Sequence, residues 1–291
     1  MNTAPPLPWR VRPPRVRPAG FVAPRFRFGH ADGNGGAPDD ERIPFSRVRA
    51  RAALALIDSK QTAAHAHVVV PCDYSAVDAA RGDARSMFAA VEGFSLTALP
   101  FVAVAVCRAL RAFPDVNVTV ADDGTIVEHR DVALGIAVDL AHTGLVVPVV
   151  RDADGLTLRG LARAIHGIAA QARDKKLRPD DLMGGTFTIT NPGSHGTALS
   201  FPIIHRPQAA ILVTDGVHRT VVARSGTEAR PRGLTAGSGS DPWSSGGLDI
   251  RPVGMLGLGF DHRVIDPHTA GAFTACVRDE LQSTDWAVHL R

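Results

Sequence analysis

The sequence predicts an α/β or α+β domain, in which helices pack against a β-sheet. Apolar segments with strand character alternate with segments that have a helical period, and this alternation is typical of such domains. The clearest helix is expected over residues 157–176, where leucine, isoleucine and alanine side chains recur at spacings of 3, 4, 3 and 4. Hydrophobic residues make up 45% of the 291-residue chain, which is enough for a substantial core.

Residues 1–41 are expected to be a disordered, Pro/Arg-rich leader. Six arginines and seven prolines lie within residues 1–28, which contain no acidic residue and no helical or strand period. Because the net charge of the chain is +3, the remainder carries 3 − 6 = −3. The basic character therefore belongs to the leader. Without aromatic stacking motifs or a recognition fold, it does not predict a nucleic-acid partner.

One folded domain is expected over residues 42–291. Its first helix should begin near Pro44, because Val48, Ala52, Ala55 and Leu56 share one helical face there. Further along we expect, in order, a strand at 67–77, a buried helix at 96–113, strands at 131–140 and 144–152 around a turn at 141–143, a helix at 157–176 with Thr157 as its N-cap, strands at 184–191, 209–223 and 250–260, and a last helix at 268–283.

Residues 224–249 are rich in glycine and serine and lack any period, so a flexible surface loop is expected between two hairpin strands. No stretch is apolar and long enough to predict a membrane partner, and no signal-peptide segment is found, so the cytoplasm is the expected location. Three widely separated cysteines, Cys72, Cys107 and Cys276, predict buried, reduced thiols.

Several common motifs are absent from the sequence. It contains no Walker A loop and no GxSxG nucleophile motif. Residues 152–156, DADGL, resemble the start of a calcium loop, but the later glutamate ligand is missing. No metal is therefore predicted.

The segment GFDHRVIDPHTAG, residues 259–271, contains the strongest candidate for chemistry. A buried strand that ends at Phe260 would bring His262 to the edge of the sheet. An imidazole there can accept a proton from a hydroxyl or thiol near neutral pH. Asp266, one turn later, could fix the local backbone through a salt bridge, for instance to an arginine. The residue types alone leave both a catalytic and a structural role open for His262.

Four blocks of the sequence resemble, in order, the catalytic domain of the dihydrolipoamide acyltransferases, the E2 components of 2-oxoacid dehydrogenase complexes. They are RIPFSRVRARAALALIDSKQTAAHAHV, which contains a T-x-x-H segment, DVALGIAVDLAHTGLVVPVVRDADGLTLRGLARAI, GGTFTITNPGSHGTALSFPIIHRPQAAIL and LGLGFDHRVID. The resemblance covers about residues 42–291. It implies the chloramphenicol acetyltransferase-like fold, an α+β two-layer sandwich with a mixed central sheet.

The resemblance also implies roles for individual residues. His262 would be the general base, Asp266 would support the site's geometry, and Thr190 would donate its hydroxyl to the oxyanion of the tetrahedral intermediate. It further implies a homotrimer in which His262 faces Thr190 of a neighbouring subunit across a channel. The residues expected along that channel are Asn191, Pro202, His205, Arg206 and Phe260.

The implied acyl donor is acetyl-CoA or another coenzyme A thioester. A thioester already has a good leaving group, so a base, an oxyanion donor and a channel that excludes water are sufficient, without a metal. Candidate contacts for the coenzyme A phosphates are Arg47, Arg49 and Lys60 in the first helix. Each is explained equally well as an exposed helix charge.

Three departures from the family pattern favour a freestanding enzyme. Only about 41 residues precede the catalytic domain, and none of the chain's three lysines lies in the context of a lipoyl attachment site. Pro267 replaces the family's glycine after Asp266, so the turn there should differ or need no positive φ. The block IIHRPQ replaces IINPPQ, which places His205 and Arg206 near the mouth of the channel.

These features together predict an acyl-CoA-dependent O-acetyltransferase with a small, hydroxyl-bearing acceptor. The chain resembles the E2-like acyltransferases of tetronate polyketide pathways in antibiotic biosynthesis, which acetylate a hydroxymethyl group before a partner enzyme eliminates acetate. Two alternatives remain open. One is a dihydrolipoamide acyltransferase core served by a separate lipoyl protein, and the other is an inactive structural scaffold. The retention of His262, Asp266 and Thr190 weighs against the scaffold.

Overall fold

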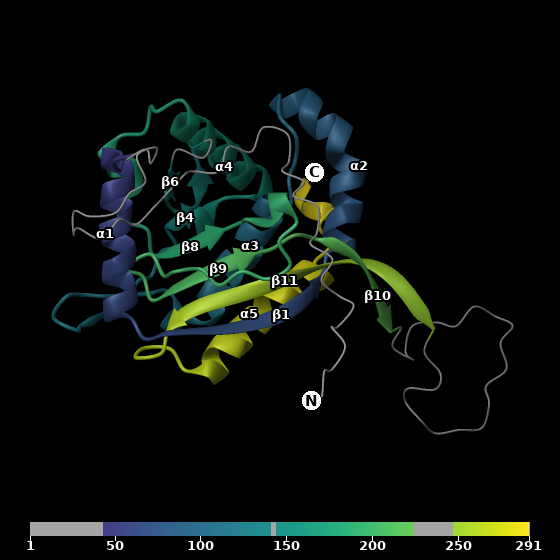
Figure 1. Cartoon of the computed structure of the whole chain (residues 1–291). Helices are drawn as coiled ribbons and strands as arrows, with labels where there is room; N and C mark the ends of the chain where they lie inside the picture. Colours follow the sequence, from purple (N-terminus) through teal and green to yellow (C-terminus); the bar gives the residue numbers. More distant parts are fainter. Residues whose placement is uncertain (1–42, 141–143, 224–246, 291) are drawn as a thin grey trace, which may run out of the picture. The chain divides into compact units, whose positions relative to one another are not determined.

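The computed structural model describes residues 43–140, 144–223 and 247–290 (Figure 1). The expected leader, the turn at 141–143 and most of the loop expected at 224–249 lie outside these residues. The boundary between leader and domain therefore stays a prediction.

A seven-stranded mixed sheet forms the centre of the described domain. Its strands are β1 (His65–Asp73), β4 (Leu134–Ile136), β7 (Val149–Val150), β8 (Phe187–Thr190), β9 (Ala210–Thr214), β10 (His218–Ala223) and β11 (Leu248–Asp261). The order across the sheet is β1-β11-β9-β8-β4-β7, and β10 pairs with the first half of β11. β8 is parallel to β4 and β9, whereas the other pairs are antiparallel. The expected α/β architecture with a mixed sheet is confirmed.

Three helices pack on one face of this sheet: α3 (Leu99–Ala112), α4 (Leu158–Arg173) and α5 (Pro267–Ser283). α5 lies along β1 and β11, and α3 lies between α4 and α5 (Figure 1). Thr157 is the N-cap of α4, as expected, because its Oγ1 accepts a hydrogen bond of 3.1 Å from the backbone nitrogen of Gly160. No helix among the described residues is both long and apolar enough to cross a bilayer.

Helix α1 (Arg47–Thr62) begins close to the expected position, after Ser46, whose Oγ accepts a hydrogen bond from the backbone nitrogen of Arg49. Its apolar face is not buried by the described residues: Val48 is 49% exposed and Leu56 is 47% exposed. Ser59 is the buried side chain of this helix. The apolar face that the spacing predicted is therefore largely exposed in the described part of the chain.

Some elements have too weak a pattern to be predicted from spacing. These are α2 (Ser75–Glu92) and the short strands β2 (Val118–Val120) and β3 (Ile126–Glu128). The strands β5 (Val138–Asp139) and β6 (Leu145–Val146) lie within the predicted strand ranges 131–140 and 144–152, and they pair with each other around the turn. In α2 only Val77, Ala80 and Phe88 are buried, so its amphipathic period is incomplete. Short strands hold too few residues for an alternation to be recognised.

The antiparallel pair of β10 and β11 confirms the hairpin that was expected around residues 224–249. Leu248 and Asp249, which were assigned to the loop, are the first residues of β11. Two of the three cysteines, Cys72 and Cys107, are buried, Cys276 is half-buried, and all are free thiols.

Candidate active site

His262 lies directly beyond the C-terminal end of β11, at the edge of the sheet. Its backbone nitrogen donates a hydrogen bond of 2.9 Å to the carbonyl of Ala64, which ties the turn to the start of β1. Its imidazole is exposed, and the ring centroid lies 5.9 Å from that of Phe260. An exposed imidazole on a fixed backbone has the geometry that a general base needs.

Phe260 does not lie along an open channel, contrary to expectation. Its side chain is 1% exposed and belongs to the hydrophobic core. Because side chains alternate between the two faces of a strand, Phe260 shares the helix-covered face with Leu258. It therefore supports the ring of His262 from the core side.

The carboxylate of Asp261 anchors the turn that carries His262, a role the sequence analysis missed. It is buried, accepts hydrogen bonds of 3.1 Å from the backbone nitrogens of Ala64 and Arg263, and pairs with the Arg263 guanidinium. Burial raises the pKa of this carboxyl, but the hydrogen bonds from Arg263 and Ala64 outweigh that effect and lower the pKa. The ionised carboxylate thus holds the backbone on both sides of His262. The sequence DHR, in which an arginine follows an aspartate by two residues, could have predicted this ion pair.

Asp266 is the N-cap residue of α5 and has an exposed side chain. Within the described ranges it makes no side-chain hydrogen bond or ion pair. The expected salt bridge to an arginine is formed by Asp261 instead, because Asp261 points inward at the strand end. Pro267 is the first residue of α5, where a missing N–H costs no helical hydrogen bond and no positive φ is required.

Thr190 is the last residue of β8 and is half-buried. The next residue, Asn191, is exposed, and its Oδ1 accepts a hydrogen bond of 2.9 Å from the backbone nitrogen of Gly193. A Cβ atom at Gly193 would lie 2.6 Å from the carbonyl oxygen of Asp215, so this turn requires glycine. The chain therefore turns tightly just behind the proposed oxyanion donor.

Thr190 and His262 are not brought together within one chain. Thr190 pairs with Val213 on β9, and Val213 pairs with Gly257 on β11. His262 follows Gly257 by 262 − 257 = 5 residues, which corresponds to about 16 Å at about 3.3 Å per residue. A base and an oxyanion donor must each lie about 3 Å from the reacting atoms. One chain alone therefore does not place both residues on the same acyl group.

Arg206 is held by two carboxylates from different parts of the chain. Its guanidinium forms ion pairs of 2.6 Å with Asp58 on α1 and of 3.1 Å with Asp122 in the turn between β2 and β3. Its neighbour His205 is exposed. Arg206 thus ties the segment before β9 to α1, and its charge is already balanced before any ligand binds.

The carbonyl of Pro202 is also in contact with β1. It lies 3.2 Å from Nε2 of His67, and the His67 ring packs edge-on against Phe201 with centroids 5.2 Å apart. Pro202 is half-buried, whereas Phe201 is 60% exposed. These residues cover the face of the sheet opposite the helices, and the place of Pro202 along a channel stays a prediction.

The candidate contacts for coenzyme A do not form a cluster. Arg47, Arg49 and Lys60 are distributed along α1, and 60 − 47 = 13 residues correspond to about 20 Å at a rise of about 1.5 Å per residue. Lys60 is exposed in the last turn of the helix. Lys60 lies too far along the helix from Arg47 to bind the same phosphate, and the assignment of these residues to coenzyme A stays a prediction.

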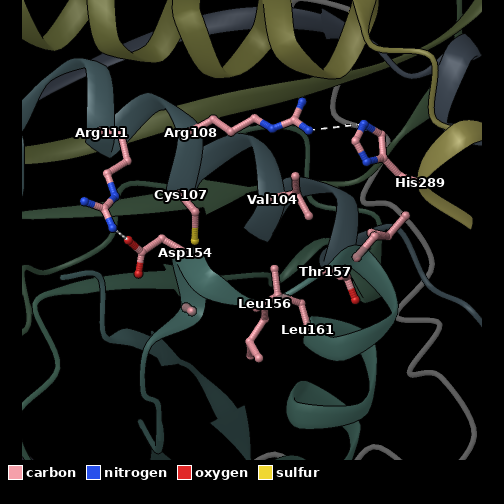
Figure 2. Close-up of a pocket in the computed structure, with 11 residues that line it drawn as sticks. Val104, Cys107, Arg108, Arg111, Asp154, Leu156, Thr157, Leu161 and His289 are labelled. Carbon is pink, nitrogen blue, oxygen red and sulfur yellow. Dashed lines mark hydrogen bonds and ion pairs between the residues drawn. The ribbon is translucent and has the colours of Figure 1, made fainter.

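The pocket drawn in Figure 2 lies between α3 and the start of α4 and has a volume of about 210 Å³. Arg111 forms an ion pair with Asp154 there, and Arg108 lies 3.1 Å from His289. Burial raises the pKa of Cys107 to about 12, so its thiol is not a nucleophile at neutral pH. None of the predicted catalytic residues lines this pocket.

The described part of the chain contains no group of three or more metal-ligating side chains.

Comparisons with known proteins extend these observations. The family model of the 2-oxoacid dehydrogenases acyltransferase catalytic domain matches residues 37–288. The dihydrolipoyllysine-residue acetyltransferase component of the pyruvate dehydrogenase complex from Mycobacterium bovis is 39% identical over 238 residues, 81% of this chain and 40% of the relative. The lipoamide acyltransferase component of the branched-chain alpha-keto acid dehydrogenase complex from Bacillus subtilis is 36% identical over 86% of this chain and 54% of the relative. The chain thus spans 40% to 54% of these relatives.

A solved structure with high similarity is that of the dihydrolipoamide acetyltransferase (E2p) from Azotobacter vinelandii. Its TM-score is 0.74 at 30% sequence identity, over 84% of this chain and 92% of that chain. The catalytic mechanism of that enzyme was investigated at a serine, a histidine and an asparagine, and the asparagine follows the histidine by four residues.

Proposed function

Because the chain belongs to the 2-oxoacid dehydrogenase acyltransferase family, we propose that it transfers an acyl group from coenzyme A to a small acceptor with His262 as general base. The observation that carries the proposal is the exposed imidazole on a turn fixed by Ala64 and Asp261. The spacing between His262 and Asp266, 266 − 262 = 4, also equals that of the histidine and asparagine studied in the Azotobacter vinelandii enzyme.

In the proposed reaction, His262 removes the proton from the acceptor's thiol or hydroxyl as that atom attacks the thioester carbonyl. The C–O double bond opens to an oxyanion, to which the Thr190 hydroxyl donates a hydrogen bond. The intermediate then collapses, the bond to sulfur breaks, and the coenzyme A thiolate takes the proton back from the imidazolium. Charges and protons balance without a metal or a covalent enzyme intermediate.

We propose that the working site is formed between copies of the chain in a homotrimer. Thr190 and His262 are offset by about 16 Å along the strand direction, and they lie on strands that are not neighbours. This offset supports a shared site, since two copies could each supply one of the two residues. The exposed apolar residues of α1, among them Val48 and Leu56, offer surface that a second copy could cover.

One candidate acceptor is dihydrolipoamide. It is supported by the relatives, whose names describe acetyl and other acyl transfer in dehydrogenase complexes. In that case the chain supplies the acyltransferase activity of such a complex, with the lipoyl group on a separate protein.

The second candidate acceptor is the hydroxymethyl group of a tetronate, with acetyl-CoA as donor and a partner enzyme that eliminates acetate. It is favoured by the altered block that contains His205 and Arg206. Arg206 pairs with Asp58 and Asp122, so the wall of the proposed channel is built differently from the family pattern IINPPQ. Acetyl-CoA fits the expected cytoplasmic location.

The deciding experiment incubates the purified full chain with acetyl-CoA and each acceptor in parallel, and measures acetylated acceptor by mass spectrometry. Mass detection is needed because dihydrolipoamide carries thiols that interfere with thiol reagents. Product with one acceptor, abolished by His262→Ala, identifies the acceptor class. Equal product from the wild-type and His262→Ala proteins would overturn the mechanism. The absence of product with either would favour the inactive scaffold.

A further inference from the structure

Ile204, in the segment before β9, has both of its backbone polar groups bonded to side chains from α1 and β1. Its carbonyl accepts a hydrogen bond of 2.6 Å from the hydroxyl of Ser59, and its backbone nitrogen donates one of 3.1 Å to Nε2 of His65. Ile204 is 1% exposed and Ser59 is also 1% exposed. A buried backbone N–H that loses its acceptor destabilises the fold, so the Nε2 atom of His65 stabilises this segment by accepting the hydrogen bond.

The same contacts fix the protonation state of His65. Its Nδ1 lies 3.1 Å from the carbonyl of Ala63, which can only accept, so Nδ1 carries the proton. Its Nε2 accepts from the Ile204 nitrogen and is therefore unprotonated. The ring is neutral, with its proton on Nδ1.

Three titratable groups face the His65 ring from the elements around it. Burial is the largest influence and lowers the pKa of His65, and the charges of Lys60 on α1 and His67 on β1 lower it further. The bond to the Ala63 carbonyl raises it, as does the carboxylate of Asp261 on β11, but the pKa is lowered on balance. The electrostatics thus agree with the neutral ring that the hydrogen bonds require.

His65 is also linked directly to the turn that carries the proposed base. The residue before it, Ala64, donates from its nitrogen to Oδ1 of Asp261 at 3.1 Å and accepts at its carbonyl from the His262 nitrogen at 2.9 Å. His65 itself pairs with Asp261 in the register of β1 and β11. His65 therefore holds the segment at Ile204, and the preceding residue, Ala64, holds the turn at His262.

We propose that His65 is a positioning residue for acyl transfer, which couples segment 202–206 to the turn that carries His262. This inference rests on the proposed function, because it assigns segment 202–206 to the wall of the acceptor channel. Loss of the acceptor at Nε2 would release Ile204 and shift Pro202 and Arg206 relative to His262. Protonation of His65 would have the same effect, since a protonated Nε2 repels the Ile204 N–H.

The test uses two substitutions that separate the ring's two nitrogens. His65→Gln retains an acceptor oxygen at about the position of Nε2 and does not titrate. His65→Asn retains a donor near Nδ1 but has no group that reaches Ile204. His129→Gln is the matched control, because His129 is another half-buried histidine, bonded at 2.9 Å to Thr119 and not to this segment.

Two readouts are measured on the full chain: kcat/KM for the acceptor, and hydrogen-exchange protection of peptides that cover residues 202–206. We expect His65→Asn to lower kcat/KM about tenfold and to reduce the protection, and His65→Gln to stay within about threefold of wild type. Because the pKa of His65 is lowered, the protection should fall in the wild type and the His129→Gln control only at pH values below the ordinary histidine range, and it should not fall in His65→Gln.

Unchanged kcat/KM and protection in His65→Asn would overturn the proposal, as would equal losses in His65→Gln and His65→Asn. Circular dichroism melts show whether each variant is folded. If the wild type acetylates neither acceptor, the proposed function fails, whereas the protection data still decide whether His65 holds the segment.

Discussion

The guanidinium of Arg263 and the carboxylate of Asp261 form an ion pair, with 2.6 Å between Nη2 and Oδ2, on either side of His262. Asp261 is 2% exposed, and its Oδ1 also accepts a hydrogen bond from the backbone nitrogen of Ala64. The backbone of His262, between the two partners, is thus held in place, while its imidazole is exposed. This arrangement separates the task of holding the turn from the task of moving a proton.

Replacing Asp261 with asparagine should lower the free energy of unfolding by about 1–2 kcal/mol at pH 7, because charge-assisted hydrogen bonds become neutral ones. The folded-state pKa of Asp261 is lowered, so its stabilisation is present above the unfolded value of about 3.9 and is lost as pH falls through the folded value. In urea unfolding, the free energies of unfolding of wild type and variant should therefore differ at pH 7 and become equal in strong acid. Asp279→Asn, which alters an exposed pair with Arg278, should change stability by less than about 0.5 kcal/mol.

Replacing His262 with alanine should lower kcat by at least about 10²-fold, because the acceptor loses its general base. Stability should be unchanged, since the imidazole is exposed and its backbone hydrogen bond to Ala64 remains. His268→Ala, at another exposed histidine in the first turn of α5, is the control and should keep wild-type activity. Product formation and thermal melts are measured on all three proteins. Full activity of His262→Ala would remove His262 from the mechanism.

Replacing Thr190 with valine should lower kcat by about 10²-fold, whereas Thr190→Ser should retain most activity because it keeps the hydroxyl donor. The contrast is Thr188→Val, two residues earlier on β8. Thr188 is buried, and its hydroxyl donates to Oε1 of Gln208 at 2.6 Å, so this change should lower stability by about 1–3 kcal/mol. Steady-state kinetics and urea unfolding together distinguish the two positions. A Thr190→Val enzyme as active as Thr190→Ser would exclude the hydroxyl's role.

Mixing two inactive variants tests whether the site is shared between copies. In one chain Thr190 and His262 are about 16 Å apart along the sheet, so a composite site needs each residue from a different copy. Co-expression of His262→Ala with Thr190→Val should regain a measurable fraction of wild-type activity, because some interfaces then hold both intact residues. The double variant, in which every copy lacks both residues, is the control and should stay inactive. Failure of the mixture to recover would indicate a site within one chain.

Features of this protein that depend on local pattern could be predicted from the order of its amino acids. The 3, 4, 3, 4 spacing predicted α4, Thr157 was identified as its cap, and the strand before His262 was located from an apolar run. Motifs in a fixed order indicated the family that the comparisons then showed. These features are local because a helix stripe, a cap or a strand run is decided by residues a few positions apart.

Contacts between residues far apart in the chain became visible in the folded domain alone. Asp261 and Asp266 are both close to Arg263 in sequence, and the inward position of Asp261 at the strand end makes it the partner. The separation of Thr190 from His262 follows from the register of three strands, and the bond between His65 and Ile204 joins residues 139 positions apart. Such contacts depend on which strands pair, in which register, and on which face of the sheet the helices pack. The local spacing of apolar residues does not encode this long-range pairing.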